Sequence, residues 1–247
     1  MRHVLRNFLL PTLTMVLFVT CKSEDPEPSL FYLSKVTTEL YTREYTFDGE
    51  KAIGSTYTEG ATKVTATFTY NGAGDITNIN YSDDTHEAIF YLNGNIISRK
   101  KYDTTSKLLS QWDYEYSGIQ LTKVQFYEVA DGIPYAAGLR VYEYDDTAAD
   151  DPAQVKEFFK HTPTTPSTSV YTYDQAKGAL SAAPAALKKY FRVLNISTEK
   201  NVVKIVNDTR TWNYAYEFND SGYPTKRVET SSTGQAFTTS YDYTAVN

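Results

Sequence analysis

The sequence predicts an all-β protein, built as an antiparallel meander of repeated hairpins. Strict alternation is the first observation: over residues 64–70, Val, Ala, Phe and Tyr alternate with threonine, as in a half-buried strand. The second is the turn signal Asn71-Gly72-Ala73-Gly74, whose residues tolerate positive φ. The third is composition: aromatic residues make up 15% of the chain, and they suit the pleated surface of a sheet.

The first twenty residues are typical of a targeting segment. Arg2 and Arg6 precede an apolar run over residues 8–19, which is too short for a permanent membrane span. The only cysteine, Cys21, follows this run. Its position resembles the lipobox of bacterial lipoproteins, although Thr20 stands where Gly, Ala or Ser is usual. The resemblance implies a signal peptide over residues 1–20, lipidation of Cys21 and a membrane anchor there. An uncleaved anchor or a leftover thiol in a secreted protein are the alternatives.

Residues 21–34 are predicted to be a flexible linker behind the lipidated cysteine. The stretch after Cys21 reads Lys22-Ser23-Glu24-Asp25, and this acidic cluster resembles the surface-export signal of Bacteroidota lipoproteins. The resemblance implies an outer-membrane lipoprotein exposed on the cell surface. A solvated linker is the alternative, and the prolines that follow would suit one.

A repeated unit fills the predicted single β domain over residues 35–247. An aromatic residue followed by a turn recurs at intervals of about 20 to 30 residues, with one longer gap that suggests a hidden unit. The aromatic residues are Phe47, Tyr70, Tyr91, Tyr116, Tyr144, Tyr173, Phe218 and Tyr243. The strands leaving the turns share a second pattern, seen in Ile76-Thr77-Asn78-Ile79, Leu121-Thr122-Lys123-Val124 and Val202-Val203-Lys204-Ile205.

Together these two patterns resemble the YD repeat of the RHS family. More closely, the chain resembles Bacteroidota surface lipoproteins of unknown function with degenerate YD (RHS-like) repeats. Literal Tyr-Asp pairs start at Tyr102, Tyr144, Tyr173 and Tyr241. The chain is far shorter than the toxin-enclosing shells of RHS proteins, so no toxin-delivery role follows from the resemblance.

Two stretches interrupt the repeat. Residues 145–154 are polar and acidic, which predicts a long hairpin loop. Residues 180–194 are rich in Ala, Leu and Lys around Pro184, which favours a short helix. We expect this helix at one end or edge of the sheet, where it would cover unpaired backbone groups.

Sequential hairpins favour one large twisted sheet that curls into an open barrel or half-pipe with its aromatic side chains inside. A β-sandwich is the alternative, because one apolar face per strand fits either fold. The aromatic faces are also candidate ligand platforms, since Trp and Tyr can stack on sugar rings or contact proteins. The candidate platform residues are Trp112, Tyr114, Tyr116, Trp212, Tyr214 and Tyr216. A core role explains the same alternation.

The sequence contains no recognisable catalytic or cofactor motif. After processing, only His86 and His161 would remain as histidines, and neither has a metal-like spacing. Asp145, Asp146, Asp150 and Asp151 are weak calcium candidates in an acidic loop that lacks the Gly and Glu of an EF-hand. We therefore expect no enzyme activity, no cofactor and no catalytic residues.

The functional expectation rests on the predicted cellular location and on the surface chemistry. A formal net charge of −6 argues against a nucleic-acid partner. We expect a non-enzymatic binding module on the cell surface, for a glycan or a host or dietary polymer. The alternative is a structural or adhesion protein of the envelope that makes protein contacts, and a third reading is a hydrolase of unrecognised type.

Overall fold

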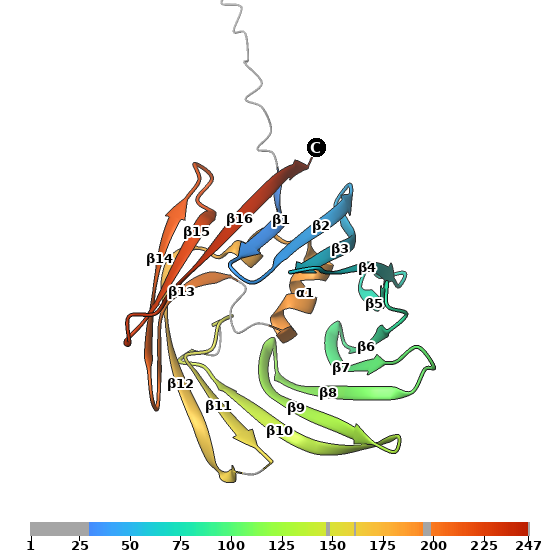
Figure 1. Ribbon diagram of the computed structural model, residues 1–247. Helices are drawn as coiled ribbons and strands as arrows, with labels where there is room; N and C mark the ends of the chain where they lie inside the picture. The colour runs from blue at the N-terminus through green and yellow to red at the C-terminus, as the bar shows by residue number, and fades with distance from the viewer. Residues whose placement is uncertain (1–29, 147–148, 161, 195–198, 247) are drawn as a thin grey trace, which may run out of the picture.

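A single closed antiparallel barrel contains all sixteen strands of the described residues (Figure 1). The computed structural model describes residues 30–146, 149–160, 162–194 and 199–246. The strands are β1 (Leu30–Thr38), β2 (Thr42–Asp48), β3 (Lys51–Glu59), β4 (Thr62–Tyr70), β5 (Ile76–Tyr81), β6 (His86–Leu92), β7 (Asn95–Tyr102), β8 (Leu108–Ser117), β9 (Gln120–Ala130), β10 (Ile133–Glu143), β11 (Gln154–Phe159), β12 (Thr162–Lys177), β13 (Lys200–Asn207), β14 (Thr211–Phe218), β15 (Pro224–Ser231) and β16 (Ala236–Val246).

The all-β class and the antiparallel meander are confirmed, but the expected open barrel or half-pipe, and the alternative sandwich, are wrong. Strand β1 pairs with β16 from Leu30↔Val246 to Thr38↔Thr239, so the sheet closes on itself. Closure removes the two edges on which an open sheet would leave unpaired backbone groups. Residues 30–34, assigned to the linker, belong to β1, whereas the predicted signal peptide and Cys21 lie outside the described residues.

The repeated aromatic turn marks one end of the even-numbered strands. Tyr70, Ser117 and Phe218 are the last residues of β4, β8 and β14. Glycines in the turns take positive φ, for example +82° at Gly74, a conformation that costs other residues energy. The acidic stretch over residues 145–154 joins β10 to β11, which pair as an antiparallel hairpin, as predicted. The long gap in the repeat contains the helical segment and β13.

Tyrosines beside these turns bind the neighbouring odd-numbered strand. Each of them donates its hydroxyl hydrogen to a main-chain carbonyl near the start of that strand, and we call these bonds the tyrosine ties. They join Tyr91 to Ile76 (2.8 Å), Tyr144 to Leu121 (2.9 Å), Tyr173 to Pro152 (2.7 Å), Tyr216 to Val202 (2.8 Å), Tyr243 to Pro224 (2.8 Å) and Tyr70 to Ala52. Buried carbonyls need such partners, so the ties account for part of the unusual tyrosine content.

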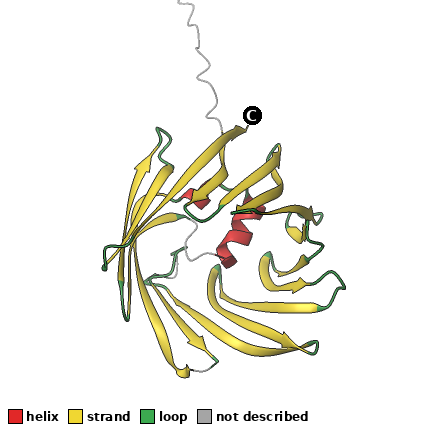
Figure 2. Ribbon diagram, viewed as in Figure 1, coloured by secondary structure: helices red, strands yellow, loops and turns green. Residues whose placement is uncertain are grey.

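The predicted helix exists, but its expected position at an edge of the sheet is wrong. A 3-10 turn, η1 (Ala179–Ala182), and the helix α1 (Ala185–Leu194) lie inside the ring of strands (Figure 2). Leu187 and Phe191 are only 1% and 3% exposed and belong to the barrel core. A barrel this wide has a lumen that wall side chains cannot fill, and its closed sheet has no edge to cover. No helix among the described residues combines the length and apolar character needed to cross a membrane.

The two faces of the barrel wall differ in chemistry. Side chains of Tyr45, Tyr114 and Tyr142 face inward and pack in or against the core. Many of the alternate positions face outward and carry threonine, asparagine and charged residues, with exposed apolar side chains among them at Phe90, Leu109 and Val170. Cross-strand ion pairs occupy this outer face at Lys35 with Glu44 (2.8 Å), Lys123 with Glu115 (2.9 Å), Lys226 with Glu217 (2.8 Å) and Lys156 with Glu143. The aromatic side chains at the alternating positions of these strands are therefore inside, as the sequence predicted, whereas others such as Phe90 and Tyr102 lie on the outer face.

Candidate functional site: the barrel lumen

Helix α1 fills one half of the lumen. Its apolar side chains pack on the inner faces of strands from β3 to β11, which we call the filled half. Phe191 meets the Tyr45 ring edge-on at 5.6 Å between centroids. Two ion pairs also hold the helix. Lys189 pairs with the nearly buried Asp75 at 2.7 Å, and Arg192 pairs with Asp150 at 3.3 Å. Polar contacts thus fix a helix whose apolar face is already buried.

A buried polar cluster ties the helix to the wall of the filled half. The Tyr190 hydroxyl donates to Oε2 of Glu87 at 2.9 Å, and the Tyr81 hydroxyl donates to Oε1 at 3.1 Å. The Arg99 guanidinium lies 3.4 Å from the same carboxylate and 3.9 Å from the centroid of the Trp112 ring. Burial, and then the Glu87 charge, raise the pKa of Tyr190 well above its usual value, so this phenol stays protonated as a donor.

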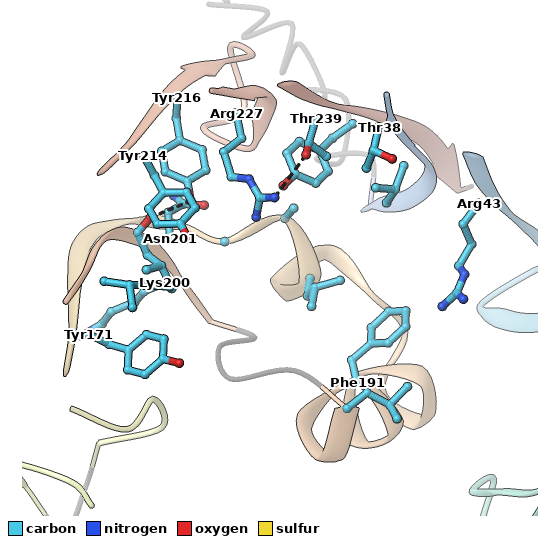
Figure 3. A pocket seen from close by; sticks show the side chains of 18 of the residues that line it. Thr38, Arg43, Tyr171, Phe191, Lys200, Asn201, Tyr214, Tyr216, Arg227 and Thr239 are labelled. Carbon is cyan, nitrogen blue, oxygen red and sulfur yellow. Dashed lines mark hydrogen bonds between the residues drawn. The ribbon is translucent and has the colours of Figure 1, made fainter. Parts of the chain in front are cut away.

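The other half of the lumen holds a cavity of about 400 Å³ (Figure 3). Strands β12 to β16, together with β1 and β2, form its wall, and we call this side the hollow half. Helix residues Phe191 and Leu194 close it toward the filled half, and η1 contributes Ala179 and Leu180. Six tyrosines and three cations contribute to the lining, namely Tyr41, Tyr45, Tyr171, Tyr214, Tyr216, Tyr241, Arg43, Lys200 and Arg227.

Arg227 enters this cavity from β15. Its Nη2 donates to the Thr239 hydroxyl at 3.2 Å and lies 3.5 Å from Oε2 of Glu229. The guanidinium carbon is 5.4 Å from the centroid of the Tyr214 ring. Its Nε is buried and has no hydrogen-bond partner in the described part of the chain. A buried donor without a partner is costly, which makes it available to a ligand.

Arg43 enters from β2, where the cavity adjoins a second one of about 280 Å³. Its guanidinium carbon lies 5.5 Å from the centroid of the Tyr57 ring. Within the described ranges, no carboxylate forms an ion pair with Arg43, and the titratable groups beside it are phenols, chiefly Tyr45, which also makes a hydrogen bond with it. Burial raises the pKa of Tyr45, so that neighbour stays neutral. Arg43 is therefore a half-buried cation without a counter-charge.

The structure places the six candidate platform residues on inward-facing strand positions but does not bring them together. Tyr214 and Tyr216 line the cavity. Tyr114 is 5% exposed in the filled half, and Trp112 lies beneath Arg99. Tyr116 packs against the core, and Trp212 lies near Phe237 at 6.4 Å between ring centroids. A shared ligand platform for all six stays a prediction. Of the six, Tyr214 and Tyr216 line this cavity.

The calcium candidates are engaged by other groups. Asp150 pairs with Arg192, and the buried Asp151 accepts a hydrogen bond from the Lys200 main-chain N–H at 3.2 Å. The part of the chain that the structure describes contains no group of three or more residues placed to hold a metal ion. His86 stacks on Tyr102 at 4.9 Å between centroids, an outer-face contact. Asp145 and Asp146 are exposed in the loop after β10.

Sequence reasoning missed Arg43, Lys200 and Arg227. A usable signal was present for two of them, because Arg43 and Arg227 occupy the inward positions of their strands. Arg43 precedes Tyr45 by two residues, so both share a face. A cation on the aromatic face of a strand is out of place in a plain core, and it deserved a functional reading.

The comparisons with known proteins identify a shared fold. No protein-family model matches the sequence, and a search of curated proteins finds no relative. A porin-like protein from Bacteroides uniformis superposes with a TM-score of 0.58 at 14% identity, over 88% of this chain and 98% of that one. A porin-like protein from Bacteroides vulgatus gives 0.58 and 14%, over 86% and 99%. The barrel fold is shared with both.

The Tc holotoxin pore of Photorhabdus luminescens also matches, with a TM-score of 0.25 at 16% identity over 83% of this chain and 8% of that one. A score this low carries no argument about fold. Lipidation at Cys21 is tested by none of these comparisons and stays a prediction.

Proposed function

We propose that this protein is a lipid-anchored surface barrel that holds a small ligand in its lumen, without enzymatic chemistry, and that its wall faces water. The carrying observation is the distribution of polarity across the wall: the aromatic face is inside and the ionic face outside. The fold shared with porin-like proteins is compatible with an outer-membrane or surface location, and the proposal concerns how the barrel is attached there.

The outer face argues against a transmembrane barrel. A lipid-facing wall needs an apolar band about 25 Å tall, and a lysine at the bilayer midplane costs about 2–4 kcal/mol. Here the outward positions in the middle of strands include Thr67, Asp113 and Asn213. The cross-strand ion pairs described above add charges around the barrel. Such a wall is suited to water, so attachment would fall to the predicted lipid at Cys21.

The lumen supplies the binding site. A cavity of about 400 Å³ lies within the range of small-molecule sites, about 300–1,000 Å³. Aromatic walls with a few fixed polar groups are the usual lining of such sites. This volume suits a small molecule or the end of a polymer. Of the polymer ligand expected from the sequence, only an end would therefore enter the cavity.

An adhesion role is the second candidate. Val170 and Val206 face outward as direct cross-strand neighbours on β12 and β13, at 44% and 39% exposure. Exposed apolar pairs can mark protein contacts. The hydrolase reading has less support, because the cavity lining includes no carboxylate among the described residues, and acid–base hydrolysis of glycosides needs two.

Fractionation of cells that express the full chain tests the proposal. Wild type should sediment with the outer membrane, and Cys21→Ser should leave the membrane as a folded, soluble barrel. A transmembrane barrel would stay in the membrane whether or not Cys21 is lipidated. Ser23→Ala serves as the control, because it alters a neighbouring residue and keeps the cysteine. Because an uncleaved signal peptide would also hold the variant in the membrane, Cys21→Ser is expressed behind a cleavable secretory signal, and membrane retention of the folded, cleaved variant would overturn the proposal.

A further inference from the structure

We propose that the hollow half selects an anionic ligand, one that joins a carboxylate, sulfonate or phosphate group to a ring-shaped body. This inference rests on the proposed function, since it names the ligand class of the same lumen. It is carried by Arg43 and Arg227, which reach into one aromatic cavity from different walls (Figure 3).

The charge of the cavity is opposite to that of the chain. The protein carries a formal net charge of −6, yet Arg43, Lys200 and Arg227 all line the cavity, and the described lining residues include neither Asp nor Glu. The carboxylates nearby have partners: Glu229 lies 3.5 Å from Arg227, and Asp174 accepts hydrogen bonds from the Asn201 amide at 3.2 and 3.3 Å. Glu229 offsets Arg227, whereas Arg43 has no carboxylate partner in the described ranges, so its charge is the one that a ligand in this cavity would meet.

Two guanidinium groups have N–H donors that a ligand could use. Arg43 has phenols and a ring face beside it and no carboxylate partner in the described ranges. Arg227 keeps a buried Nε–H without an acceptor. Guanidinium groups bind carboxylates and phosphates through paired N–H donors. A bound anion would supply acceptors that the protein lacks, and electrostatic attraction inside a protein cavity is stronger than in bulk water.

The rest of the wall fits a ring. Tyr171, Tyr214 and Tyr241 present aromatic faces or edges to the cavity, and Phe191 and Leu194 close its inner side. Aromatic surfaces pack well on sugar rings and on planar aromatic rings. A free inorganic anion would satisfy the arginines and leave these walls uncovered, so the ring-bearing acid is the better match.

A pair of fluorescent probes isolates the contribution of charge. 8-Anilinonaphthalene-1-sulfonate is an anion, and N-phenyl-1-naphthylamine has the same ring system without the sulfonate. The lipid-free chain starting at Lys22 contains every strand of the closed barrel, and circular dichroism and a cooperative thermal transition would verify that it is folded. We expect saturable binding of the sulfonate at least tenfold tighter than that of the neutral probe, and displacement by D-glucuronate but not by D-glucose.

Variants then locate the charge. Arg43→Gln and Arg227→Gln should each weaken sulfonate binding about tenfold and leave binding of the neutral probe unchanged. Arg210→Gln is the matched control, because Arg210 is exposed in the turn before β14, and it should change neither probe. If the Gln variants fail to fold, Arg43→Lys and Arg227→Lys replace them, because lysine keeps the charge. If these also fail, the ratio of the two probe affinities in the unmutated chain decides whether the lumen prefers an anion.

The outcomes separate the two proposals. Equal binding of both probes, unaffected by the arginine variants, would overturn the anionic ligand and leave the binding lumen standing. Binding of neither probe to the folded chain would overturn both. A loss in Arg210→Gln as large as in the lumen variants would also overturn the anionic site, since the attraction would then come from the overall surface charge.

Discussion

The two halves of the lumen are built from the same hairpin and differ in what occupies the space they enclose. In the filled half, Leu187, Tyr190 and Phe191 of α1 join the core and leave beside it only the smaller cavity, of about 280 Å³. In the hollow half, Tyr214, Tyr216 and their neighbours face a cavity. The repeat therefore determines the wall, and helix α1 determines which part of the lumen is packed. The binding site that we propose lies on the side that the helix leaves more open.

The largest test of this comparison is Glu87→Gln in the filled half. The substitution leaves Arg99 buried beside a neutral amide, and breaking a buried ion pair costs about 3–5 kcal/mol. Urea unfolding should show a loss of stability of that order. Glu115→Gln removes an exposed partner of Lys123 and should cost below about 1 kcal/mol. Equal costs at the two sites would mean that the filled half is not a core.

A matched pair of truncations compares the halves directly. Leu187→Ala empties a site that is 1% exposed, and such changes cost about 2–5 kcal/mol. Ile205→Ala removes a half-buried side chain that borders the cavity and should cost about 1 kcal/mol, because little packing is lost. Thermal or urea unfolding of both variants provides the measurement. A larger loss for Ile205→Ala would reverse the assignment of solid and hollow halves.

Alkaline pH should destabilise the barrel through its tyrosines. Burial raises the pKa of Tyr114 and of Tyr144 to about 12, against an ordinary value of about 10. Between these values the unfolded chain loses phenol protons that the folded chain keeps. Stability is thus fully present below pH 10 and falls by about 1.4 kcal/mol per pH unit for each such tyrosine as pH rises.

Tyrosinate absorbance and circular dichroism, followed together, measure this effect. The absorbance of the buried tyrosines should rise with the loss of the fold. Phenolate absorbance that reaches its full value in a barrel with native circular dichroism would contradict the burial of these side chains.

The smallest effect belongs to the tyrosine ties, which both halves share. Tyr91→Phe in the filled half and Tyr243→Phe in the hollow half each remove one hydrogen bond to a main-chain carbonyl. Each should cost about 1 kcal/mol, and urea midpoints would show whether the two costs agree. Tyr102→Phe, on the outer face, is the control and should change stability by less than about 0.5 kcal/mol. Unequal costs for the two ties would show that the wall itself differs between the halves.

The sequence predicted the wall well, because its information is local. Alternation around Phe68 and the turn at Asn71 require only neighbouring residues, and the aromatic ends of strands follow from the same period. Closure could not be predicted, because it depends on how strand number, tilt and stagger combine around the whole sheet. The tyrosine ties were also missed, since the acceptor of each hydroxyl is a carbonyl on another strand.

The helix and the site were only partly predictable. The composition around Pro184 indicated a helix, but an amphipathic helix can cover a sheet edge or fill a lumen. Because the closed sheet has no edge, the helix fills the lumen. Arg43 and Arg227 were hard to single out from the sequence, because charged residues are common on strands. Their meaning depends on two walls that meet across the lumen, and strands far apart in the chain supply them.

The pairing of β1 with β16 sets the order in which the barrel can be completed. Leu30 must wait for Val246, so the most distant residues of the described chain form one of the last ladders, at a high entropic cost of loop closure. Until then, a growing sheet exposes two sticky edges that can join other chains. A chain that stops before β16 would keep both edges open and would be more prone to pair with other chains than the closed barrel is.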